Sequence, residues 1–256
     1  MDLLFRASSL GKLMTKSRTK SEPISATAKS ELLKLYLYHE YKRTEDISNK
    51  YIDKGIAVEN DAIDIWRRHT GNIVFKNETR FRNDYVTGIP DLLVKNDDGS
   101  IAFVPDIKSS WSLTTYYNSM LDDISSDYYW QGQAYCWLVG APYAVFVFVL
   151  CNTTSTLLDD EKHRAAWRMG AIDTESPEYI ERCKQIERNM IFDMDKFKRD
   201  NPYTHIHHSA DEWQYDIQVE KRIHEKMVWY DQSSIDELIE RVPTWRDYVT
   251  KLNSYI

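Results

Sequence analysis

The segment at residues 143–150, YAVFVFVL, constrains the fold of this chain more than any other feature. Eight consecutive apolar residues, rich in β-branched and aromatic types, are typical of a deeply buried strand. The preceding residues predict a helix at 51–71, strands at 72–82, 85–95 and 100–108, and a second helix at 125–140. This order of helix, three strands, helix and strand indicates an α/β fold.

Charged residues lie at the ends of two neighbouring predicted strands, in GIPDLLVKNDDGSIAFVPDIKSSW at residues 88–111. If the turn-like NDDGS closes a hairpin, Asp91 comes near Asp106 and Lys108 at the same end of the sheet. Asp106 and Lys108 are two residues apart on one strand, so their side chains share a face. Glu59 lies on the apolar stripe of the helix at 51–71 and is a candidate third carboxylate.

Carboxylates this close to one another repel and resist burial, which favours a site that binds a divalent cation. Ligands that are all oxygen favour magnesium or manganese over zinc. Such a cation suits phosphodiester hydrolysis, in which Lys108 would orient the attacking water and counter the developing negative charge. The alternative is an exposed Asp–Lys pair, worth less than about 1 kcal/mol, and a glutamate at the edge of its helix. That alternative fits each residue alone better than it fits the set.

Four motifs occur in the order found in the PD-(D/E)xK nuclease superfamily: KGIAVENDAIDIWRRHTG at 54–71, GIPDLLV at 88–94, DIK at 106–108 and YYWQGQAYCWLVG at 128–140. Residues 50–150 therefore resemble this superfamily, and more closely its YqaJ-type viral recombinase family, which includes phage lambda exonuclease. Gln131 and Tyr135 resemble the QxxxY element of the RecB-like branch. The resemblance implies a restriction-endonuclease-like core with helical additions at the N and C termini.

The resemblance also implies a metal-dependent exonuclease that uses Mg2+, with Mn2+ as a substitute. Such an enzyme resects double-stranded DNA ends from 5′ to 3′ and leaves a 3′ single strand for phage recombination. By motif position, Glu59, Asp91, Asp106 and the backbone carbonyl of Ile107 would bind the metal. Lys108 would be the catalytic lysine, and Gln131 would assist at the same site. The implied partners are double-stranded DNA ends, a single-strand annealing protein and further copies of the chain in a homotrimer.

The chain departs from the family at two positions, neither of which removes the site. Asp106 stands where glutamate is commoner, and Gly132 inside the second helix costs about 1 kcal/mol relative to alanine. Two other functions fit a chain of this kind: an endonuclease of the same fold, and a DNA-binding protein that keeps the fold without activity. A closed circular duplex would distinguish an endonuclease, and a protein without activity need not keep all the active positions.

Seven further residues have side chains suited to DNA contact: Arg6, Ser8, Ser9, Ser109, Trp111, Gln133 and Tyr135. The first three lie in FRASSLGKLMT at 5–15 and resemble residues with which relatives hold the 5′ phosphate. Helix capping by a serine is the alternative for this segment. The residues beyond Lys108 could touch the DNA backbone or stack on a base, although plain packing is the stronger interpretation for Trp111. An aromatic residue such as Tyr135 on a helical stripe is also more often part of the core.

Composition limits the remaining possibilities. The net charge of −7 argues against a protein that simply coats nucleic acid, although residues 1–34 hold seven basic and three acidic residues. We expect a cytoplasmic protein without a membrane span, because the sequence has no apolar run of 18 residues and no apolar leader. The three cysteines share no CxxC spacing, which argues against a disulfide framework or a zinc ribbon. A structural role is favoured for HIHH at 205–208, which has no partner at ligand spacing.

The chain divides into three predicted regions. Residues 1–50 form a helical segment with possible contacts to DNA or its 5′ phosphate, and residues 51–152 form the nuclease core. Residues 153–256 are expected to be helical, from the period and charge pattern at 177–200 and 216–252. We expect this last region to pack on the core or to form a subunit interface.

Overall fold

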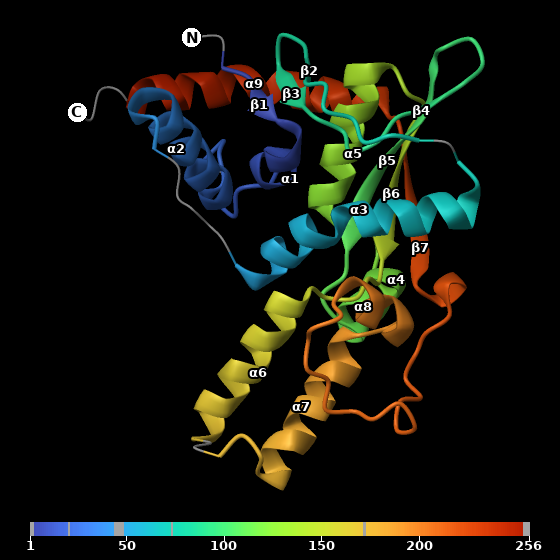
Figure 1. The fold of residues 1–256 in the computed structure, drawn as a ribbon. Coiled ribbons are helices and arrows are strands. Elements are labelled where there is room, and N and C mark those ends of the chain that lie inside the picture. The colour runs from blue at the N-terminus through green and yellow to red at the C-terminus, as the bar shows by residue number, and fades with distance from the viewer. Residues whose placement is uncertain (1–2, 20, 44–48, 73, 171–172, 253–256) are drawn as a thin grey trace.

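The computed structural model describes residues 3–19, 21–43, 49–72, 74–170 and 173–252. Its centre is a four-stranded sheet in the order β4-β5-β6-β7, formed by Val94–Lys95, Ile101–Ser109, Tyr143–Val149 and Ile223–Trp229. β5 and β6 are parallel, whereas β4 and β7 pair antiparallel at the two edges. A smaller sheet has the order β1-β3-β2, formed by Phe5–Arg6, Val86–Gly88 and Phe81–Arg82 (Figure 1). The predicted α/β fold class is confirmed.

Helices cover both faces of the four-stranded sheet. α3 (Lys50–Thr70) packs Ala62 and Trp66 against the face that carries Val145 and Val147. α5 (Ser126–Val139) covers the opposite face, with α1 (Leu10–Leu13), α2 (Ala26–Tyr41) and α9 (Gln232–Leu252) beyond it (Figure 1). β6 is buried at every residue after the first, as its apolar sequence predicts.

Helix α5 approaches the sheet closely at Gly132. A Cβ atom at this position would lie 3.1 Å from a ring carbon of Phe146 and 3.3 Å from Val228. A larger residue would therefore push the helix away from the sheet. This close packing explains why a glycine, which weakens an isolated helix, stands at position 132. It also sets how near the neighbouring Gln131 lies to β5.

The two strands predicted at 72–95 are much shorter than expected. Among the described residues of this stretch, only Phe81–Arg82, Val86–Gly88 and Val94–Lys95 are strands, with one isolated bridge between Lys76 and Leu92. Pro90 explains the break between β3 and β4, because proline has no N–H to donate to a ladder. The predicted hairpin between β4 and β5 is confirmed: Asn96 N donates to Ser100 O at 2.9 Å, and Gly99 takes a positive φ of 84°.

The prediction of a wholly helical C-terminal region is wrong for residues 223–229, which form β7. All seven residues of β7 pair with β6. β6 is a buried strand whose second edge needs hydrogen-bonding partners, and that requirement outweighs the helix-like charge pattern of the segment. The region 153–256 is therefore not a separate helical addition, because it completes the central sheet. α4 (Leu113–Leu121), between β5 and α5, is a further element that the sequence did not predict.

Helices α6 (Ser155–Met169), α7 (Pro177–Met190) and α8 (Met194–Asp200) extend from one end of the sheet (Figure 1). α7 carries the buried carboxylate of Glu187, which accepts hydrogen bonds from the Nδ1 atoms of His207 and His208 at 2.9 and 2.7 Å. Lys162 Nζ forms an ion pair with Glu187 at 2.9 Å. The structural role predicted for HIHH is confirmed, because these two histidines hold a buried glutamate in place.

The three cysteines are free and buried. Within the described ranges, no helix combines the length and the apolar character that crossing a membrane would need.

Candidate active site

β5 brings Asp106 and Lys108 together on the face that α5 covers. The Lys108 ammonium forms an ion pair with Asp106 Oδ2, and Asp106 is only 1% exposed. Nζ also lies 5.1 Å from the ring centroid of Tyr128, which belongs to α5. Parallel pairing with β6 sets Asp106 opposite Phe146, so an apolar ring closes one side of the carboxylate. The predicted placement of Asp106 and Lys108 on one face is confirmed.

Asp91 lies where the chain has left β3 and has not yet entered β4. Its Oδ2 accepts a hydrogen bond from Ile107 N at 2.8 Å. The carboxylate thus takes the position of the carbonyl that a continuous strand would offer to β5. The predicted proximity of Asp91 to Asp106 and Lys108 is confirmed, because Ile107 lies between those two residues.

The turn that carries Asp91 is held by a residue that sequence reasoning missed. Asn77 Nδ2 donates to Pro90 O at 2.9 Å, and Asn77 N donates to Asp91 O at 2.7 Å. These bonds satisfy two carbonyls in a segment that lies outside the strands. Nothing in the polar stretch around Asn77 distinguished it from its neighbours.

A chain of hydrogen bonds connects the exit of β3 to Asp106 through α5. Gln131 Nε2 lies 3.3 Å from Asp106 Oδ1 and 3.0 Å from the hydroxyl of Tyr135, and that hydroxyl donates to Ile89 O at 3.2 Å. Gly88 allows this approach, since a Cβ there would lie 2.7 Å from a ring carbon of Tyr135. Gln131 therefore lies at the candidate site, as predicted.

Glu59 reaches the same region from α3, on the opposite face of the sheet. It is close enough to Asp91 to contribute to the raised pKa of that carboxyl. Its Oε1 forms an ion pair with Lys76 Nζ at 2.9 Å, and both side chains are partly exposed. Lys76 was not a sequence candidate, because it lies in a segment with no readable motif. Three carboxylates and two ammonium groups therefore gather here.

The electrostatics of the site distinguish Asp91 from Lys108. Burial, Asp106 and Glu59 together raise the pKa of Asp91 to about 7, against the opposing effects of Lys108 and the Ile107 amide. Burial opposes the charge on Lys108, but Asp106 and Asp91 outweigh it and raise the pKa of the ammonium. Lys108 therefore stays protonated at neutral and alkaline pH, whereas the charge of Asp91 is poorly compensated.

The donor set offers a partial fit to a divalent cation. Asp106 Oδ2 is buried, and its one partner among the described residues is the ammonium of Lys108. The ionised form of Asp91, beside Asp106, is unfavourable without a cation. Oxygen donors of this kind suit Mg2+ or Mn2+. Across the described ranges, no three His, Cys, Asp or Glu side chains are arranged to hold an ion together. The carboxylate of Glu59 is paired with Lys76 in this structure.

Two of the predicted DNA contacts are wrong, because the side chains are buried. Gln133 has no exposed surface, and its amide joins Trp229 O and Asp231 N at 2.7 and 2.8 Å. It connects α5 to the end of β7. Tyr135 is 5% exposed, and its hydroxyl donates to Ile89 O and accepts from Gln131 Nε2. It therefore positions the site without facing solvent.

The other candidate DNA contacts remain near the surface. Arg6 and Ser8 are exposed, whereas Ser9 donates to Glu31 Oε1 at 2.9 Å and caps no helix through its side chain. Ser109 ends β5 and is half-buried. Trp111 packs edge-on against Tyr51, with ring centroids 5.1 Å apart, which supports the packing interpretation for this residue.

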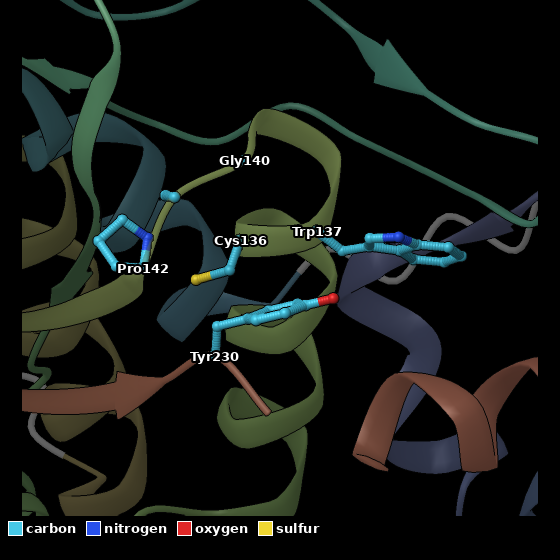
Figure 2. Close-up of a pocket in the computed structure, with 6 residues that line it drawn as sticks. Cys136, Trp137, Gly140, Pro142 and Tyr230 are labelled. Atoms are coloured by element: carbon cyan, nitrogen blue, oxygen red, sulfur yellow. The ribbon is translucent and has the colours of Figure 1, made fainter. Parts of the chain in front are cut away.

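A surface pocket of about 340 Å³ lies at the C-terminal end of α5 and includes none of the candidate catalytic residues. Figure 2 shows its lining: Cys136, Trp137, Gly140, Ala141, Pro142 and Tyr230. Burial raises the pKa of the Cys136 thiol to about 12, so that this group stays protonated and is a poor nucleophile. The carboxylate–lysine cluster is therefore the stronger candidate for catalysis.

The fold is that of known exonuclease structures. A phage-related exonuclease from Haemophilus somnus 129PT has a TM-score of 0.70 and 23% sequence identity, over 99% of this chain and 96% of that chain. An alkaline exonuclease from Laribacter hongkongensis, LHK-Exo, has a TM-score of 0.59 and 14% identity, over 98% and 90% of the two chains. Its complex with dAMP has a TM-score of 0.57 and 15% identity over the same shares. No family model and no curated protein matches the sequence.

Proposed function

We propose that this chain is a metal-dependent exonuclease that degrades one strand of double-stranded DNA from its 5′ end. The carrying observation is the cluster of Asp91, Asp106, Lys108 and Gln131 around β5, in a chain whose fold matches phage-related and alkaline exonucleases. One of those neighbours is a complex with a deoxynucleotide, which is in line with a nucleotide product. Resection in this direction leaves a 3′ single strand.

Asp91 and Asp106 would hold the divalent cation, Mg2+ or Mn2+. Glu59 would join them by exchanging its ion pair with Lys76 for the cation. When bound, the cation supplies positive charge that polarises the scissile phosphodiester. A family-like contribution from the carbonyl of Ile107 is part of the same proposal, because the Ile107 amide already binds Asp91.

Lys108 would act through its charge and not as a base, because its pKa is raised and it stays protonated. The ammonium would orient the attacking water and stabilise the negative charge that develops on the phosphoryl oxygens. Gln131 would keep Asp106 in its orientation through the bond to Oδ1. The apolar rings of Tyr128 and Phe146 beside Nζ exclude water and strengthen these interactions.

The test is digestion of linear duplex DNA labelled at either end, with Mg2+ or with EDTA, beside a closed circular duplex. We expect release of the 5′-terminal label first, no cleavage of the circle and no reaction in EDTA. Lys108→Ala should lower the rate roughly 100-fold or more, while a matched change at an exposed ion pair on α7, Lys184→Ala, should not. Cleavage of the circle would indicate an endonuclease, and earlier release of the 3′ label would refute the proposed direction.

A further inference from the structure

Lys54 is a buried ammonium that the proposed chemistry does not use. The residue lies on α3 and is 1% exposed. Its Nζ donates to the backbone carbonyls of Ser110 and Trp111, both at 3.0 Å. In the part of the chain that the structure describes, this ammonium has no carboxylate partner. Burying a charge without a counter-ion costs several kcal/mol, so a residue of this kind calls for an explanation.

The surroundings of Nζ compensate its charge only in part. The ring centroids of Trp111 and Phe192 lie 5.7 and 5.6 Å away and contribute cation–π attraction. The neighbouring thiol of Cys151 is neutral, because burial raises its pKa to about 12. Burial accordingly lowers the pKa of Lys54 to about 8. For stability alone, an apolar side chain of similar volume would serve as well or better.

The two hydrogen bonds of Lys54 join α3, which carries Glu59, to the two residues that directly follow β5, which carries Asp106. Glu59 follows Lys54 by five residues in the same helix, about 7.5 Å along its axis. Ser110 follows Lys108 by two residues at the end of β5. Elsewhere α3 and β5 share an apolar cluster that includes Val58 and Ile107. Apolar contacts are not directional and permit small shifts of the helix along the sheet, whereas hydrogen bonds to two successive carbonyls define one position.

We propose that Lys54 is a positioning residue of this site, which sets the distance between Glu59 on α3 and the Asp106–Lys108 end of β5 and thereby the affinity for a divalent cation. The inference rests on the nuclease function proposed above. It assigns a role to a residue that touches neither the cation nor the DNA. Residues that orient metal ligands from behind typically change metal affinity 10- to 100-fold when they are replaced.

The test measures Mn2+ binding to the DNA-free chain by calorimetry, and DNA cleavage separately. Lys54→Met removes both donors at nearly constant volume and should weaken Mn2+ binding about tenfold. It should also lower kcat more than it changes KM for DNA. Lys54→Gln retains amide donors for a carbonyl and should show a smaller loss. The matched control is Lys162→Met, which removes another buried lysine, paired with Glu187 in the α6–α7 region, and should lower stability without changing Mn2+ affinity.

Wild-type Mn2+ affinity in folded Lys54→Met would overturn the inference, as would an equal loss of affinity in Lys162→Met. If Lys54→Met does not fold, Lys54→Gln is judged by the same criterion. A wild-type chain that binds no divalent cation would overturn both proposals. A wild-type chain that binds the cation and cleaves DNA, beside Lys54 variants that bind it equally well, would overturn this one alone.

Discussion

Replacing Asp91 with asparagine should stabilise the metal-free protein while removing its proposed activity. Asp91 Oδ2 accepts a hydrogen bond from Ile107 N at 2.8 Å, and an asparagine oxygen can accept the same bond without a charge. Burial, Asp106 and Glu59 all disfavour ionised Asp91. The substitution therefore removes an unfavourable charge and keeps the contact, so that stability and function change in opposite directions.

The size of this effect follows from the pKa of Asp91, which rises from an ordinary value of 3.8 to about 7. The folded state binds the proton more tightly than the unfolded state, so the wild-type protein loses stability as the pH rises from 3.8 to 7. A change of this size corresponds to about 4 kcal/mol above pH 7. Solvent screening at this half-buried carboxyl lowers the expected gain of Asp91→Asn at pH 8 to about 2 kcal/mol. Near pH 4 the gain should almost vanish.

The assay is urea-induced unfolding in EDTA at pH 4 and at pH 8 for wild type and variant. Asp98→Asn is the matched control: this exposed aspartate has a pKa lowered by hydrogen bonds from Ser100, so its replacement should bring no gain in stability. Adding Mg2+ at pH 8 should reverse the order, because wild type gains a ligand that the variant binds poorly. An Asp91→Asn protein that is no more stable than wild type at pH 8, or equally stabilised at both pH values, would refute the reasoning.

Three further changes test other parts of the site and the fold. Lys76→Met frees Glu59 from its ion pair and should increase the shift in Tm caused by Mn2+; an unchanged or smaller shift would argue against Glu59 as a ligand. Tyr135→Phe removes the donor to Ile89 O and leaves Gln131 Nε2 with Asp106 alone, so we expect a loss of about 1 to 2 kcal/mol in urea unfolding and a lower kcat. An unaltered kcat would contradict the positioning role of Tyr135. Glu187→Gln should cost about 3 kcal/mol at neutral pH without changing kcat per folded molecule. Burial opposes the charge of Glu187, but bonds from His207 and Lys162 lower its pKa to about 2. The contribution of Glu187 to stability is therefore present above pH 4.5 and is lost as the pH falls towards 2. Stability curves of wild type and variant that remain parallel over that range would exclude this role.

Much of the site could be predicted from local patterns. The alternation of side chains along a strand was sufficient to place Asp106 and Lys108 on one face, and the NDDG turn was sufficient to bring Asp91 beside them. Gln133 shows the limit of such patterns. It lies two residues from Gln131 in the same helix and has the same side chain, yet one amide contacts Asp106 and the other is buried against Trp229. A difference of that kind depends on what packs against each face of the helix.

The spacing of apolar residues was enough to predict α5, β5 and β6, because the pattern that indicates each element lies within its own short segment of sequence. Contacts between distant segments set the rest. β7 is a strand because the open edge of β6 needs backbone partners, and Trp66 donates to Glu225 across a separation of 159 residues. The pairing of Glu59 with Lys76 and of Lys54 with two carbonyls likewise depends on neighbours that only the folded chain supplies. Hydrogen bonds and charges are directional and short in range, so their partners cannot be read from a single segment.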